Sequence, residues 1–200
     1  MLIILRCLLP ALFLGAVIAC SSQNAPQQPP NLLQPDFVDG EGNRTRSWVL
    51  INHANPGSYT LEFKDDAVRI ERVGPEPWAR LQQSISGEQL EAAGGQWVAF
   101  AAELKGHLDN SEYPHFSGES GLHVQLVGKP PEDLRARAQG VRYTEEHTLG
   151  IPVVADIPDW QLHVLEFYLP EDIQRVEAAL IMASGGWLKM RNPALRVIEE

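Results

Sequence analysis

The sequence predicts an all-β fold, with two antiparallel sheets packed as a jelly-roll sandwich. Proline and glycine are frequent, with 15 and 16 copies among 200 residues. Short apolar runs alternate with turn residues, and no stretch keeps a convincing helical period for more than about ten residues. Many short strands joined by turns rich in glycine and proline are typical of a sandwich or a barrel, and they argue against a helical bundle.

Residues 1–19 have the composition of an export signal. Arg6 precedes an apolar stretch over residues 7–18, and the small residue Ala19 stands before Cys20. A membrane-spanning anchor is the alternative, but the stretch is barely long enough, contains Pro10 and is not followed by a basic cluster. We therefore expect a cleaved signal peptide over residues 1–19.

The end of this leader resembles the lipobox of bacterial lipoproteins, because residues 17–20 read Val-Ile-Ala-Cys. The resemblance implies that Cys20 becomes the N-terminus and carries acyl chains such as palmitate, and more than one chain gives stable anchoring. Cys7 leaves with the leader, so Cys20 has no partner for an intrachain disulfide. Ser21 and Ser22 follow without an aspartate, which by the same resemblance implies the outer membrane of the bacterial cell envelope.

A tether and one domain follow the leader. Residues 21–30 read SSQNAPQQPP and contain no large apolar side chain, so residues 20–30 are interpreted as a lipidated cysteine with a flexible tether. Residues 31–200 are long enough for a single domain with its own core.

The domain contains ten short apolar runs that we interpret as strands. Turn residues such as Gly74-Pro75, Gly94-Gly95 and Gly185-Gly186 separate them. The expected strands are residues 47–52, 58–63, 67–73, 79–85, 96–105, 121–127, 161–169, 175–183, 187–190 and 194–198. A short helix is expected at residues 131–139, where proline and acids open a segment that ends in basic residues before Gly140.

Alternation within three strands predicts which side chains face the core. The inward sets are Leu165, Phe167 and Leu169 in one strand, Leu122, Val124 and Leu126 in another, and Leu81 and Ile85 in a third. The strand at residues 96–105 is apolar on both faces apart from Glu103, so alternation leaves its two faces unassigned.

The charge of the chain restricts its partners. Sixteen basic and twenty-six acidic residues give a net charge of −10, and removal of Arg6 with the leader gives 15 − 26 = −11. A domain this acidic repels a phosphate backbone, so nucleic acid is excluded as a partner. The same charge disfavours anionic glycans and favours neutral ones.

Several segments, taken in order, resemble one family of domains. Residues 31–40, NLLQPDFVDG, carry an asparagine, two aliphatics and an Asp-Phe-x-x-Gly pattern, with Trp48 after them. Later come a Trp-to-Gln-x-aliphatic strand at residues 78–85, an Asp-Trp segment at residues 159–163, and Gly-Gly-Trp at residues 185–187. The chain resembles the carbohydrate-binding-module jelly rolls of the galactose-binding-like superfamily, which implies a β-sandwich whose function is carbohydrate binding.

Many members of that family end with an aspartate that helps to hold a structural calcium ion. The nearest positions here are Arg191 and Asn192, so calcium is doubtful, and Asp36, Asp39 and Asn192 remain only weak candidates for it. No other cofactor is expected.

Carbohydrate binding requires flat aromatic faces against the pyranose ring and polar side chains beside them for the hydroxyl groups. Alternation turns Arg80 and Gln82 outward together with Trp78 in one strand, and it turns His123 and Gln125 outward in another. The candidate ligand-binding residues are Trp48, Trp78, Arg80, Gln82, His123, Gln125 and Trp187. The alternative for each tryptophan is that it packs in the core or closes one end of the sandwich.

The sequence contains little evidence for a metal site or a catalytic site. Histidines and acids at residues 107–123 have irregular spacing in a turn-rich segment, which we interpret as a solvated loop rather than a metal site. The sequence has no nucleophile elbow and no phosphate-binding glycine loop. Glu103 and Glu166 are outward-facing acids without a defined partner for glycosidase chemistry, so we expect no enzymatic activity.

Two functions remain open at this point. The first is a lipid-anchored envelope protein that binds a neutral glycan without catalysis. The second is an envelope interaction or assembly protein, whose sandwich binds a protein partner through residues 106–120 or 129–150. Exposed aromatics flanked by polar groups would favour the glycan, and an exposed apolar patch or edge strand would favour the protein.

Overall fold

The computed structural model describes residues 29–64, 66–109, 111, 119–129, 146–153 and 156–198. Its strands are β1 (Val49–Asn52), β2 (Tyr59–Lys64), β3 (Ala67–Arg72), β4 (Ala79–Ser86), β5 (Gln96–Leu108), β6 (Ser120–Val127), β7 (Glu146–Val153), β8 (Ile157–Leu169), β9 (Arg175–Met182) and β10 (Gly186–Val197). A 3₁₀ turn, η1 (Pro56–Ser58), and a short helix, α1 (Glu88–Ala93), complete the described elements.

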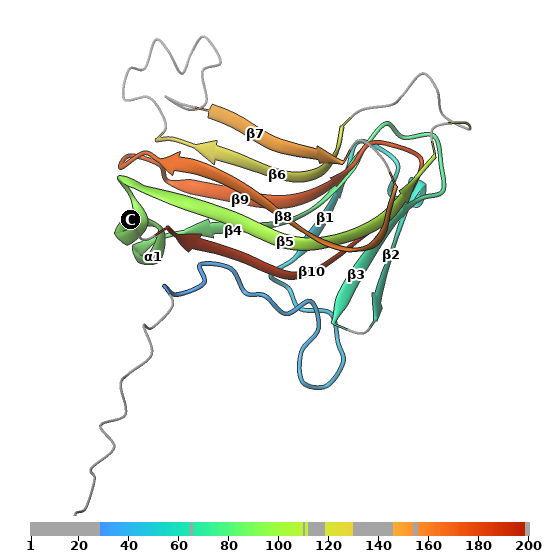
Figure 1. The fold of residues 1–200 in the computed structure, drawn as a ribbon, viewed down its shortest axis with the longest axis horizontal. Helices are drawn as coiled ribbons and strands as arrows, with labels where there is room; N and C mark the ends of the chain where they lie inside the picture. The colour runs from blue at the N-terminus through green and yellow to red at the C-terminus, as the bar shows by residue number, and fades with distance from the viewer. Residues whose placement is uncertain are drawn as a thin grey trace, which may run out of the picture.

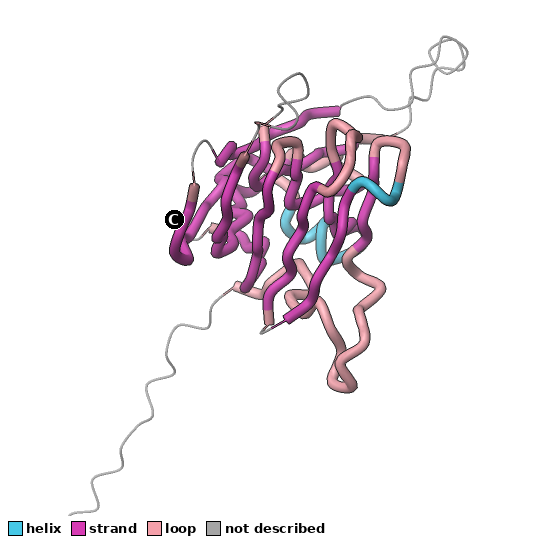
Figure 2. Tube along the Cα trace, turned by 90° about the vertical axis from the view of Figure 1, so that its right-hand side faces the viewer, coloured by secondary structure: helices cyan, strands magenta, loops and turns pink. Residues whose placement is uncertain are grey.

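The strands form two five-stranded sheets, and every pairing is antiparallel (Figures 1 and 2). The first sheet has the order β1-β4-β9-β6-β7, and the second has the order β2-β3-β10-β5-β8. β2 and β3 form a hairpin, and β6 and β7 are also consecutive strands, whereas the other neighbours come from distant parts of the sequence. The prediction of an all-β, two-sheet jelly-roll sandwich is confirmed.

The core lies between the two sheets and confirms the inward sets that alternation predicted. Leu81, Leu122 and Leu180 of the first sheet are fully buried, as are Phe100 and Leu188 of the second. All eight residues expected to point inward are buried: Leu81, Ile85, Leu122, Val124, Leu126, Leu165, Phe167 and Leu169. Burial of such apolar side chains contributes roughly 1.5–3 kcal/mol each before conformational entropy is subtracted.

The structure assigns the two faces of β5, which alternation alone left unassigned. Its buried residues are Val98, Phe100, Ala102 and Leu104, and its outward residues include Trp97, Ala99, Ala101 and Glu103. The outward positions are small, aromatic or charged. β5 lies between β10 and the edge strand β8, and alternation in the sequence does not distinguish its buried face from its outward face.

Three expectations about the elements need correction. Residues 187–190 and 194–198 belong to one strand, β10, which is interrupted between Arg191 and Ala194 by an irregularity in its pairing with β5. Strand β7 and helix α1 were not expected, because β7 contains Gly150 and Pro152 and α1 has only six residues. Proline is tolerated in β7 because this strand lies at the edge of its sheet.

The segment before β1 closes one end of the sandwich. The Asn31 side chain donates to Pro193 O at 3.2 Å and accepts from Leu195 N at 2.9 Å, and Leu32 N donates to Leu195 O at 2.8 Å. These bonds fix the start of the domain beside the end of β10.

The expected helix at residues 131–139 and the expected leader and tether up to residue 28 lie outside the described residues. No described helix has the length and apolar character needed to span a membrane.

Candidate ligand-binding face

Four of the predicted site residues lie on the outer face of the first sheet. Leu81, Leu122 and Val124 point into the core, so the intervening residues Arg80 and His123 point away from it. The pairing of the strands aligns Gln82 of β4, Ala179 of β9, His123 of β6 and Gly150 of β7 in one row across the sheet. We call Arg80, Gln82, His123, Gln125 and Glu177 the polar face.

Arg80 is the centre of the hydrogen bonds on the polar face. Its Nη1 donates to Gln125 Oε1 at 3.0 Å, and its Nη2 lies 3.3 Å from Glu177 Oε2. The other Glu177 oxygen, Oε1, lies 3.0 Å from Arg175 Nε. The carboxylate of Glu177 is therefore held between two guanidinium groups, and side chains of β4, β9 and β6 are joined in one network. Charge-assisted bonds of this kind restrict the rotamers of every member.

Three polar atoms on this face lack a hydrogen-bond partner among the described residues. They are Gln82 Oε1, Arg80 Nε and His123 Nδ1, and all three are buried. An unpaired buried polar atom costs about 1–3 kcal/mol. A sugar hydroxyl both donates and accepts, so it can satisfy an amide oxygen, a guanidinium N–H or either tautomer of an imidazole nitrogen.

The environment of His123 favours its neutral form. Burial lowers the pKa of His123, and the positive charge of Arg80 lowers it further, while the negative charge of Glu177 opposes both effects. At neutral pH the imidazole ring therefore has one donor nitrogen and one acceptor nitrogen. A neutral ring beside a neutral sugar avoids the cost of burying another charge.

A cavity of about 400 Å³ opens beside His123, between β6 and β7. Its lining includes His123, Thr148, Gly150, Pro152 and Ile181. The volume is within the range of roughly 300–1,000 Å³ found for small-ligand sites. Gly150 lies directly opposite His123 and has no side chain to fill the space above the ring. The cavity therefore extends the polar face toward the edge of the sheet.

The tryptophan candidates separate into three environments. Trp48 is 1% exposed, packs with Phe37 at a centroid distance of 5.3 Å and donates to Gln34 O at 2.9 Å, so its selection as a ligand-binding residue was wrong. Its place before β1 gave no sign that residues 31–37 would fold over it. Trp78 is half-buried directly before β4, with the His53 ring against it at 5.7 Å.

Trp187 does not belong to the polar face. It lies on the outer face of the second sheet, where Arg69 and Lys189 stand over its ring at 5.1 and 5.8 Å. The most exposed tryptophan that the structure describes is Trp97, at 52%, which was not among the predicted site residues. Because β5 is apolar on both faces, alternation carried no signal for the exposure of Trp97.

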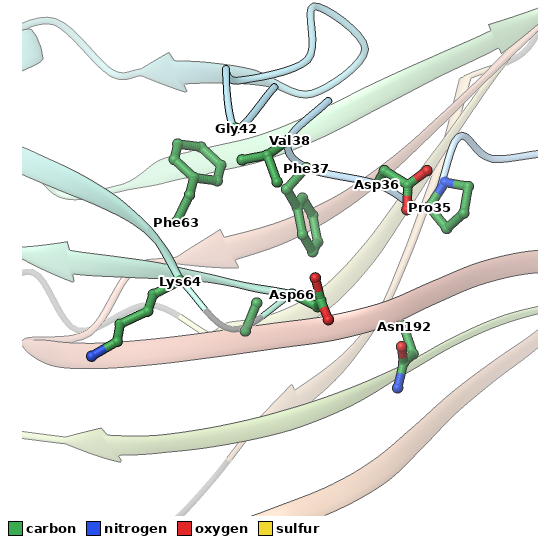
Figure 3. Close-up of a pocket in the computed structure, with 10 residues that line it drawn as sticks. Pro35, Asp36, Phe37, Val38, Gly42, Phe63, Lys64, Asp66 and Asn192 are labelled. Carbon is green, nitrogen blue, oxygen red and sulfur yellow. The ribbon is translucent and has the colours of Figure 1, made fainter. Parts of the chain in front are cut away.

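The weak calcium candidates do not assemble into a cation site. Figure 3 shows Asp36 and Asn192 beside a cavity of about 530 Å³, together with Asp66 and Phe63. Asp39 instead caps its own turn, because its Oδ1 accepts from Glu41 N at 2.9 Å and from Asn43 N at 2.8 Å. Within the described ranges, no three histidine, cysteine or acidic side chains are grouped closely enough to hold a metal ion.

The segment at residues 107–123 is only partly described. His107 belongs to the end of β5, and its Nδ1 lies 2.8 Å from Asp156 Oδ2. Both side chains are exposed, and the second Asp156 oxygen accepts from Leu108 N at 2.9 Å. This contact fastens the end of β5 to the start of β8. The remaining histidine and acidic positions at 112–118 lie outside the described residues.

The fold belongs to a known class of sandwich. The two-sheet arrangement is that of the carbohydrate-binding-module-like jelly rolls. The CBM22-1 xylan-binding domain of Xyn10C from Paenibacillus barcinonensis matches with a TM-score of 0.50 and 10% sequence identity, covering 88% of this chain and 99% of that domain. This likeness shows the fold, and the expected resemblance to carbohydrate-binding modules is confirmed at that level.

Two further solved structures show the range of the matches. TmCBM61, solved in complex with β-1,4-galactotriose, has a TM-score of 0.44 and 12% identity, covering 86% of this chain and 99% of that one. The enzymatically active domain of tailspike protein 4 from bacteriophage CBA120 has a TM-score of 0.47 and 13% identity, covering 76% of this chain. The match spans only 20% of that tailspike chain. No family model and no curated protein sequence matches this chain.

Proposed function

We propose that this chain is a lipid-anchored protein of the bacterial cell envelope whose polar face binds a neutral glycan without catalysis. The observation that carries the proposal is the convergence of Arg80, Gln82, His123 and Gln125 on one sheet face, beside an open cavity. Four outward positions from two strands that are not adjacent in the sequence meet there. The xylan-binding domain that shares the fold supports a carbohydrate as the ligand class.

The chemistry of the polar face suits hydroxyl groups better than a charged ligand. The two arginines nearest to it, Arg80 and Arg175, are already engaged by Glu177. The unpaired atoms of Gln82 and His123 are uncharged at neutral pH. A neutral sugar therefore brings no unpaired charge to this face, while the net charge of the chain repels acidic polysaccharides.

The carboxylates of the described region support a role in binding rather than in hydrolysis. Glycosidase chemistry requires one protonated carboxyl group that acts as a general acid. A second, ionised carboxylate beside it must be free to act as a base or a nucleophile. Both oxygens of Glu177 are engaged by guanidinium groups. On the other sheet, hydrogen bonds from Arg191 and Asn192 hold the pKa of Glu103 below its usual value.

The anchoring part of the proposal rests on Cys20 and the leader before it. The Val-Ile-Ala-Cys sequence at residues 17–20 is followed by serines and a proline-rich stretch that ends where the described domain begins. An acylated Cys20 would hold the domain close to a membrane, on the outer membrane if the sorting rule of related lipoproteins applies. The two parts of the proposal together describe a glycan-binding domain at the envelope surface.

The glycan-binding proposal is tested by affinity electrophoresis of the full-length protein, in detergent, through gels containing neutral or acidic polysaccharides. We expect retardation by at least one neutral polysaccharide, such as xylan, galactan or β-glucan, and weaker retardation by alginate or pectate. Arg80→Ala should weaken the binding at least tenfold, because it removes the link between β4, β9 and β6.

Arg69→Ala is the matched control for this experiment. Arg69 is also an outward arginine paired with a glutamate, since its Nη2 lies 2.9 Å from Glu71 Oε1, but it belongs to the second sheet. We expect this variant to bind like the wild type. The proposal is wrong if the wild type is retarded by none of these polysaccharides, or if the two variants lose binding equally while remaining folded by circular dichroism.

A further inference from the structure

An exposed apolar strip lies on the outer face of the second sheet, away from the polar face. Trp97 is 52% exposed, Tyr168 is 48% exposed and Leu162 is 68% exposed, which is high for side chains of this size. The strip consists of Trp97, Ala99 and Ala101 of β5 and Leu162, Val164 and Tyr168 of β8.

The pairing of β5 with β8 places these residues in neighbouring rows of one sheet face, with Glu166 between Val164 and Tyr168 on β8. Trp97 is opposite Tyr168, and the two rings meet edge to face with centroids 6.1 Å apart. Ala101 is opposite Val164 in the next apolar row. Because the alanine side chains are small, the β5 part of the strip protrudes little from the sheet. β8 forms the edge of the sheet. The result is a largely apolar surface with an aromatic pair at one end and one acidic side chain, Glu166, within it.

The charges beside the strip nearly cancel. Glu166 and Arg196 flank Ala99 on its two sides, one from β8 and one from β10. Glu103, at the other end of the strip, accepts hydrogen bonds from Arg191. A chain with a large negative charge therefore has a surface here that carries little net charge of its own.

The start of the domain lies next to this strip. Arg196 Nη1 donates to the carbonyl oxygen of Pro29, and Arg196 is paired with Ala99 of the strip. At the same end, Ile198 N donates to Trp97 O at 2.9 Å. Figure 1 shows the first described residues, in blue, close to the ends of β10 and of the described chain. Any chain that precedes Pro29 therefore leaves the domain beside Trp97 and Tyr168.

From this position we propose that the apolar strip lies against the lipid interface of the membrane to which Cys20 anchors the chain. The inference rests on the proposed lipidation and is independent of glycan binding. Pro29 lies nine residues after Cys20, a distance of about 28 Å at roughly 3.1 Å per residue. The strip is thus held within reach of the bilayer surface.

The composition of the strip matches a membrane interface. Tryptophan and tyrosine are enriched where one end of the ring is apolar and the other is hydrated, which is the environment of lipid headgroups. Because the anchor makes contact intramolecular, the effective concentration of the bilayer at the strip is high, and a weak apolar contact is sufficient to orient the domain. The polar face on the opposite sheet would then point away from the membrane.

The proposal is tested with full-length, lipidated protein in vesicles of phosphatidylcholine and phosphatidylglycerol that contain brominated acyl chains, which quench tryptophan at close range. Flotation of the vesicles reports anchoring, and tryptophan quenching reports contact of the strip. We expect bromolipid quenching in the wild type and a loss of at least half of it in Trp97→Phe. Quenching should change little between low and high salt, because the contact is apolar.

Two further variants make the result specific. Trp187→Phe is the matched control, since Trp187 is on the same sheet face but its ring is covered by Arg69 and Lys189, and we expect wild-type quenching. A double variant, Leu162→Ser with Val164→Ser, retains the reporter Trp97 and should reduce its quenching at least twofold. Thermal unfolding confirms that each variant is folded.

The possible outcomes separate this inference from the proposed function. Protein that floats with vesicles but shows no quenching of Trp97 would leave anchoring intact and overturn the membrane contact. Trp97 shielded from aqueous iodide but not quenched by bromolipid would identify a second copy or another protein as the occupant, and would also overturn it. Failure to float would disprove the anchor and this inference together, while xylan binding measured on the same samples would still report the polar face.

Discussion

Arg80 shows how one side chain joins elements that are far apart in the sequence. It contacts Gln125, 45 residues away, and Glu177 on the strand between them. Alternation in the sequence predicted that Arg80 and Gln125 point outward. It could not predict that they share a face, because that depends on β9 pairing between β4 and β6. The sequence thus predicted which residues point outward, but it did not predict that they lie together on one sheet face.

The same limit explains the tryptophan assignments. Trp48 stands near a turn in the sequence, and only the packing of Phe37 and the bond to Gln34 bury it. Trp97 lies in a strand whose two faces are about equally apolar, so its sequence neighbours did not indicate whether its side chain points into the core or outward. For both residues, exposure depends on tertiary packing that alternation within one strand does not report.

His123 provides a test of pH dependence at the residue scale. Its folded-state pKa is lowered, chiefly by burial and then by Arg80, so below the unfolded value of about 6.5 the unfolded chain takes up a proton first. Stability should therefore fall as the pH drops from 7 toward the lowered pKa of His123. The pKa of His163 is also lowered by burial and acts in the same direction.

We expect His123→Gln to reduce this loss of stability between pH 7 and pH 5, as measured by urea unfolding at each pH. The lowered pKa values of Asp39 and Glu103 affect stability mainly below about pH 5, where unfolded carboxylates begin to take up protons. An identical pH profile for the wild type and the variant would show that His123 does not titrate differently in the folded state.

At the element scale, β10 depends on a tight turn at its first residue. Gly186 has a φ of +87°, and a Cβ there would lie 2.2 Å from the carbonyl oxygen of His107. Gly87 has nearly the same backbone angle, a φ of +82°, but nothing lies within 4 Å of the position of its Cβ. The two glycines therefore separate backbone strain from steric collision.

We expect Gly87→Ala to lower the free energy of unfolding by about 1–3 kcal/mol, because its φ of +82° and ψ of −161° lie in a region that residues with a side chain rarely adopt. Gly186→Ala should cost clearly more, because the carbonyl of β5 must also move. Urea denaturation at pH 7 measures both. Equal losses in the two variants would contradict the collision at Gly186.

The elements also show where reading strands from a single sequence fails. The strands with dense aliphatic or aromatic runs overlapped the observed ones, and their cores were assigned correctly. β7 was not recognised because Gly150 and Pro152 disrupt its pattern, yet β6 supplies it with a partner over eight residue pairs. A neighbouring strand can thus impose extended structure on residues whose own preference for it is weak.

At the scale of the whole molecule, the proposed anchor makes a separate prediction. Cys20→Ala should abolish incorporation of labelled palmitate and release the protein from the membrane fraction, because no other signal would hold it there. Cys7→Ala is the matched control and should keep both properties, since Cys7 lies inside the expected leader. Fractionation with palmitate labelling in a bacterial host measures the result. Membrane retention of Cys20→Ala would show that the leader stays attached as a spanning anchor.

The bonds of Asn31 have a mechanical consequence. A protein attached at one end to a membrane and at another point to a polysaccharide is placed under tension whenever the two move apart. Here the pull would enter through Asn31 and Leu32, which are bonded to Pro193 and Leu195 of β10. β10 is the middle strand of its sheet, with β3 and β5 on its two sides. The load would therefore be shared by the sheet from the outset, and no edge strand would be peeled away first.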